Sequence, residues 1–124
     1  MAAFDAERVS RTVTGALAGP GGIGLVISVF AGLPGVAHTA ARRGLFKPQP
    51  ARLQIGDWRY EVTPDDRLRA AHVVGGIVIA EEVLLADAVG PHLARSLGQI
   101  VARYGPAVIP NIDAVLDALS ASAG

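Results

Sequence analysis

The stretch that decides the fold is TVTGALAGPGGIGLVISVFAGLPGVAHTAA, residues 12–41. It contains no Asp, Glu, Lys or Arg, and its only titratable side chain is that of His38. Such a run has little affinity for water, so it must be buried in a protein core, in a partner or in a membrane. Which of the three applies determines both the fold and the candidate contact surface.

The membrane alternative is weakened by the glycines and prolines of this run. As a helix, the run is long enough to cross the roughly 30 Å hydrocarbon core of a bilayer. Glycines and prolines at positions 19–22, 24, 32, 34 and 35 interrupt it, however, and leave only residues 23–33 as a dense apolar part. Spanning helices are richer in large apolar residues along their whole length. We therefore expect burial within protein, with peripheral membrane contact as an alternative.

The composition bounds the class of protein. The chain has 124 residues, enough for one domain with a continuous core. It is 51% hydrophobic and 18% charged, whereas about 45–50% and about 25% are typical. This excess of apolar residues predicts a homo-oligomer. The zero net charge argues against a nucleic-acid partner, and the absence of cysteine excludes disulfides and thiolate metal sites.

Local signals in the first half predict two helices. Asp5 suits the N-cap of a helix over residues 4–18, and the Gly-Pro-Gly-Gly sequence that follows ends it. A second helix is expected over residues 22–43, bent near Pro34. The Lys-Pro-Gln-Pro sequence after it predicts an extended connector, because each proline disfavours helix in the residue before it.

Signals in the second half predict a hairpin and then more helices. Apolar residues alternate over residues 52–62 around a turn at Gly56, as in an antiparallel hairpin. Thr63 and Pro64 then suit the first positions of a helix that reaches about Leu85. Gly75-Gly76 and the β-branched residues after it leave a strand open there.

Two further helices complete the prediction: one over residues 87–104, and one that Asn111 caps. Together the signals predict a mostly helical α+β fold, with four to five helices and one short antiparallel β-hairpin. We expect a single domain over residues 1–124. It comprises an N-terminal helical half (1–46), an extended connector (47–51) and a hairpin plus helical half (52–124).

No motif in the chain predicts catalysis or metal binding. The three histidines, His38, His72 and His92, match no metal-ligand spacing, so we expect no metal and no cofactor. The glycine-rich sequence at residues 19–24 superficially resembles a phosphate-binding loop, but a helix rather than a strand is predicted before it. The Asp65-Asp66 pair is explained by helix capping, and the Glu81-Glu82 pair by a solvated helix face.

Two segments, HVVGGIVIAEEVL (72–84) and GPHLARSLGQIVARYGPAVIPNI (90–112), resemble small uncharacterised proteins of actinobacteria. This resemblance implies no activity for particular residues. It agrees with a cytoplasmic location, which the acidic Asp5 and Glu7 also favour, because a secretory signal begins with basic and then apolar residues.

The sequence therefore predicts a non-catalytic interaction or scaffold protein that self-associates through residues 23–37. The residues expected to make that contact are Ile23, Leu25, Val26, Ile27, Val29, Phe30, Leu33 and Val36. One alternative is a carrier of an apolar small molecule such as a lipid or acyl group, with residues 23–37 and 75–79 lining a cavity. Another is a small enzyme that uses His72 or His92 with a nearby carboxylate.

Overall fold

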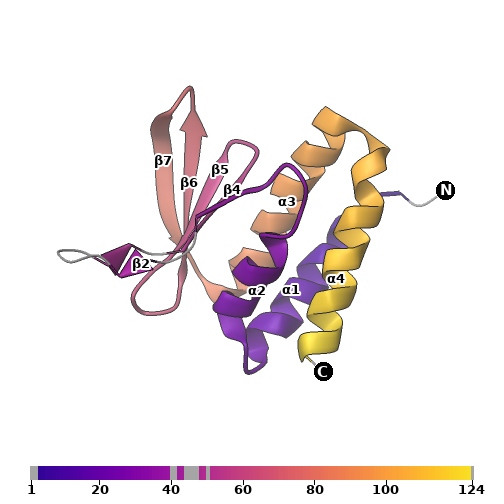
Figure 1. Ribbon diagram of the computed structural model, residues 1–124, viewed down its shortest axis with the longest axis horizontal. Helices are drawn as coiled ribbons and strands as arrows, with labels where there is room; N and C mark the ends of the chain where they lie inside the picture. Colours follow the sequence, from indigo (N-terminus) through magenta and orange to yellow (C-terminus); the bar gives the residue numbers. More distant parts are fainter. Residues whose placement is uncertain (1–2, 40–41, 44–47, 50, 124) are drawn as a thin grey trace.

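A five-stranded antiparallel sheet lies beside a layer of helices in the computed structural model, which describes residues 3–39, 42–43, 48–49 and 51–123 (Figure 1). The helices are α1 (Ala6–Ala18), α2 (Gly22–Phe30), α3 (Ala86–Tyr104) and α4 (Ile109–Ala123), and a short 3-10 helix, η1 (Pro106–Val108), precedes α4. Of these, α3 contacts both the sheet and α1, and it therefore joins the two layers.

The sheet has the strand order β1-β4-β5-β6-β7, with every neighbouring pair antiparallel. Its strands are β1 (Ala37–Thr39), β4 (Arg52–Ile55), β5 (Trp58–Val62), β6 (Leu68–Val74) and β7 (Ile77–Leu84). A separate pair is formed by β2 (Arg42–Arg43) and β3 (Pro48–Gln49). Thus β1 and β7 are the two edges of the main sheet, and β7 is much the longer of them.

The predicted helix over residues 64–85 is wrong, because this segment forms β6 and β7. Gly75 and Gly76 have φ of 57° and 80°, and two positive φ values in a two-residue loop are the requirement of a tight hairpin turn. Thr63 and Asp66 belong to the loop between β5 and β6, where the Thr63 Oγ1 accepts a hydrogen bond from the Arg67 N–H. The fold is α+β as expected, but its sheet is far more than one short hairpin.

The predicted helix over residues 22–43 is also wrong beyond Phe30. It ends there as α2, and Gly35 then takes φ +84°. The chain continues as β1, which pairs with β4 through Ala37 opposite Gln54. Residues 40–41, 44–47 and 50 lie outside the described residues, so the predicted connector 47–51 is described only at β3 and at Ala51.

The other local predictions are confirmed, except for the cap at Asn111. The Asp5 carboxylate accepts a hydrogen bond from the Arg8 N–H at 3.0 Å and caps α1. The hairpin over residues 52–62 forms as β4 and β5, and the helix predicted over 87–104 is α3. Asn111 does not cap a helix, because α4 begins at Ile109 after the turn of η1.

The core lies between the inner face of the sheet and the helices. Leu53, Tyr60 and Ala70 are neighbours across three strands, and all three are fully buried. They belong to one cluster with residues of all four helices, including Val13, Phe30, Leu97 and Leu116. The charge-free run therefore supplies α2 and part of α1 to the core of its own chain.

The opposite face of the sheet carries a row of ion pairs. Glu61 contacts Arg52 at 3.0 Å and Arg69 at 3.4 Å, and Arg69 also contacts Glu81 at 3.4 Å. Exposed pairs of this kind contribute little each, typically about 0–1 kcal/mol. They do mark this face as a hydrated surface from β4 across to β7.

Candidate functional site

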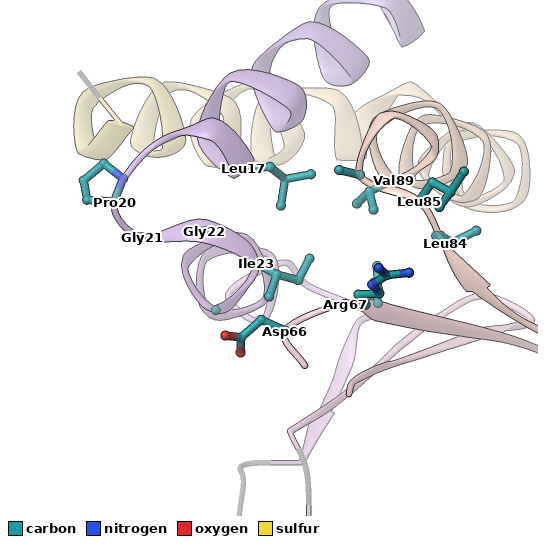
Figure 2. A pocket seen from close by; sticks show the side chains of 13 residues that line it. Leu17, Pro20, Gly21, Gly22, Ile23, Asp66, Arg67, Leu84, Leu85 and Val89 are labelled. Atoms are coloured by element: carbon teal, nitrogen blue, oxygen red, sulfur yellow. The ribbon is translucent and has the colours of Figure 1, made fainter. Parts of the chain in front are cut away.

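The described residues form a groove of about 570 Å³ (Figure 2). It lies where the turn between α1 and α2, the loop between β5 and β6, and the junction of β7 with α3 come together. Its residues are Leu17, Pro20, Gly21, Gly22, Ile23, Gly24, Asp66, Arg67, Leu68, Leu84, Leu85, Ala86 and Val89. Three segments that are distant in the sequence thus build it.

The groove is mainly apolar, with a charged edge. Figure 2 shows Leu17, Ile23 and Val89 around the same open space. Asp66 and Arg67 supply the charges, and the Arg67 guanidinium contacts Asp65 at 3.3 Å. Leu85 is 64% exposed beside it. The hollow is therefore suited to an apolar occupant that also presents some polar atoms.

A second feature is the β6–β7 hairpin, whose turn lies at the end of the sheet away from the groove (Figure 1). Seven of the eight residues of β7 are exposed. Among them Ile77 is 67% and Ile79 59% exposed, and Val74 of β6 is also exposed. From Val73 to Ala80 the chain has no charged residue. We call residues 73–80 the apolar tip.

The side chains predicted to make the contact surface lie mostly inside the molecule. Ile23, Val26, Ile27, Phe30 and Leu33 are buried in the core, and Leu25, Val29 and Val36 are partly buried against it. Only Ile23 reaches the groove, and none of residues 75–79 lines it. The apolar segment 23–37 is thus satisfied within its own chain.

His92 and His72, the two predicted catalytic candidates, lie in one aromatic cluster. The Trp58 ring stacks on His72 with centroids 4.7 Å apart and meets His92 edge-on at 4.4 Å. The Tyr60 hydroxyl lies 2.7 Å from the His92 Nδ1 and also contacts the Ser96 hydroxyl. His38 is exposed on β1 and lies apart from this cluster.

The protonation of this cluster follows from its burial. Burial raises the pKa of the Tyr60 hydroxyl far above its usual value, so it remains protonated. Burial also lowers the pKa of His92; nearby Arg95 lowers it further, whereas Glu82 opposes the shift. A neutral His92 with its proton on Nε2 accepts a hydrogen bond from the Tyr60 hydroxyl at Nδ1, and the Tyr60 oxygen can then accept a hydrogen bond from the Ser96 hydroxyl. This arrangement satisfies buried polar groups and holds α3 against β5.

The lowered pKa of His92 predicts that the protein is less stable in mild acid. Below about pH 6.5 the unfolded chain binds a proton at this position that the folded chain resists. The free energy of unfolding is therefore expected to fall as pH decreases through that region. Urea unfolding at pH 7.5 and at pH 5.5 measures the change.

Two substitutions test that assignment. His92→Gln removes the titrating group, so we expect a smaller pH-dependence, whereas His38→Gln removes an exposed histidine and should leave it intact. If His92→Gln kept the full pH-dependence, another group would be its source.

Comparison with known families gives one result. A sequence family described as a domain of unknown function, DUF5073, matches residues 1–121. The chain belongs to this family. The match spans the groove, the hairpin and the aromatic cluster alike. Neither the curated proteins nor the solved structures contain a match.

The described part of the chain contains neither a metal-binding cluster nor a membrane-spanning helix. These residues hold no group of three or more His, Asp or Glu side chains that could bind a metal ion. None of the helices in the same part is both long enough and apolar enough to cross a bilayer.

Neither the aromatic cluster nor the β6–β7 hairpin was predicted from the sequence, although a pattern in the sequence indicates each of them. His92 and Ser96 are four residues apart and therefore share one face of the predicted helix. Gly75-Gly76 between two β-branched runs is a strong hairpin signal, but the helix-compatible pattern of residues 81–85 favours a helix instead. The groove left no comparable signal.

Proposed function

We propose that this protein is a non-catalytic interaction protein that contacts its partner through the β6–β7 hairpin. The observation that carries this proposal is the exposure of the apolar tip on a long edge strand. Large apolar side chains clustered on a protein surface mark interaction sites. Edge strands in addition present unpaired backbone groups to a partner.

The contact surface differs from the one that the sequence favoured. Association through residues 23–37 would require α2 to leave the core, because Val26 and Phe30 are fully buried. Association through the apolar tip requires no rearrangement of the fold. The same class of function is therefore supported, but at a different surface.

Photo-crosslinking in cells tests the proposal. A photoreactive amino acid at position 77 should give covalent adducts with protein after irradiation. The matched control is position 118, an exposed alanine of α4. Adducts at 77 that are no more frequent than at 118 would contradict the proposal.

The groove supports a second candidate, a binder of an amphiphilic small molecule such as a fatty acid. Its apolar wall and charged edge fit an acyl chain with a polar end. Its volume lies within the range of small-molecule sites, about 300–1,000 Å³. A native mass spectrum of the purified protein that retained such a compound would favour this candidate.

A further inference from the structure

The apolar tip and the groove lie at opposite ends of the same strand. The tip includes the first half of β7, from Ile77, whereas Leu84 and Leu85 line the groove at its other end. Leu85 lies eight positions after Ile77, which corresponds to about 26 Å of extended chain. The exposed apolar tip and the apolar groove therefore lie at the two ends of β7, one strand length apart.

A twofold axis across the middle of β7 brings each of these surfaces to its counterpart in a second copy. When two such hairpins lie antiparallel, the tip of each one reaches the groove end of the other. Both contacts then form in the same dimer, and neither copy has an unused contact surface for a third copy. We propose that this chain forms a twofold dimer in which the apolar tip of each copy occupies the groove of the other. This proposal rests on the proposed function and names its partner.

The charges on β7 favour this arrangement over a parallel one. A parallel pair in register would place Glu81 and Glu82 beside their own copies, and like charges opposite each other destabilise a sheet. In the antiparallel pair, with the axis near Ala80, these carboxylates face the apolar half of the other strand. Glu81 is in addition neutralised by Arg69 of its own chain.

The edges of the sheet favour a closed pair over a filament. The opposite edge, β1, has only three residues. It offers too short a partner for head-to-tail growth.

Sedimentation equilibrium of the full chain at micromolar concentrations tests the dimer. The expected mass is twice the 12.7 kDa of one chain. Ile77→Lys at the tip and Leu85→Asp at the groove should each raise the dimer Kd by at least about tenfold. Ala118→Lys and Ala118→Asp on exposed α4 are the matched controls and should leave the mass unchanged. Circular dichroism checks that every variant remains folded.

A mixture of the two interface variants tests the tip-to-groove contact itself. A pair of one Ile77→Lys chain and one Leu85→Asp chain has one native contact and one contact between Lys and Asp. We therefore expect the equimolar mixture to dimerise again. A mixture that stays monomeric would overturn the tip-to-groove contact.

Cysteine crosslinking gives an independent measurement, because the chain has no native cysteine. With the axis near Ala80, Ile77 of one copy lies opposite Val83 of the other, and Val83 is exposed. Under mild oxidation, the double variant Ile77→Cys, Val83→Cys should therefore give a covalent dimer. The single variant Ile77→Cys should give none, since its thiols lie at opposite ends of the interface. A strong dimer from that single variant would show that the tips meet each other and would overturn the proposal.

The outcomes also separate this inference from the proposed function. A wild-type chain that is monomeric at high micromolar concentration overturns the dimer. If position 77 still crosslinks to other proteins in cells, the interaction function stands with a different partner. If an acyl compound occupies the groove and excludes the second copy, the dimer is likewise overturned.

Discussion

Replacing Phe30 by alanine is expected to lower the free energy of unfolding by about 3–5 kcal/mol. Phe30 is the last residue of α2, and its side chain is fully buried in the core between the sheet and the helices. Removing the ring loses its burial and leaves a cavity that fixed helices on several sides cannot fill. Urea unfolding monitored by circular dichroism measures the loss.

Ser28 provides the matched control, because it is exposed on the same helix. Ser28→Ala should change the free energy of unfolding by no more than about 0.5 kcal/mol. A different result for Phe30→Ala would revise the role of the charge-free run. If stability changed little but association changed strongly, residues 23–37 would be an interface rather than core.

The burial of the charge-free run could be predicted from its composition, whereas its secondary structure could not. Residues without charge must avoid water, and α2 does so inside its own chain. A helix through residue 43 was predicted because residues 36–43 have a helix-compatible pattern. The structure instead pairs β1 with β4, a contact between segments that no local pattern reveals.

The segment after Thr63 shows how a local signal can favour the wrong element. Thr63 and Pro64 have the residue types of a helix start, but the same types occur in tight loops. Two glycines with positive φ and the β-branched residues beside them favour a hairpin. Pairing with β5 along the length of β6 then stabilises it as part of a sheet.

The candidate sites depend on such nonlocal contacts throughout. Tyr60 and His92 are 32 residues apart and meet only because α3 packs on β5. The groove requires the α1–α2 turn to lie beside the β7–α3 junction. The apolar tip, by contrast, lies within one hairpin, so the prediction of that hairpin would have been enough to find it.

Replacing Gly90 by alanine is the second substitution expected to have a large effect. Gly90 lies on α3 where this helix crosses α1, and α1 and α3 are extensively in contact. A methyl group at this position would lie 2.6 Å from the Ser10 carbonyl oxygen and 2.9 Å from the Thr14 hydroxyl oxygen. The carbonyl belongs to the backbone of α1, so the clash is relieved only if the two helices separate.

We expect Gly90→Ala to lower the free energy of unfolding by about 1–3 kcal/mol, in the range of overpacked cores. Gly15→Ala is the control, since Gly15 lies within α1 and a methyl group there has no neighbour within 4 Å. Alanine favours helix over glycine, so that substitution should stabilise the protein by about 0.5–1 kcal/mol. Opposite signs for the same chemical change would show that the crossing of α1 and α3, rather than helix propensity, determines the result at Gly90. Equal stabilisation at both positions would mean that these helices lie farther apart than the structure places them.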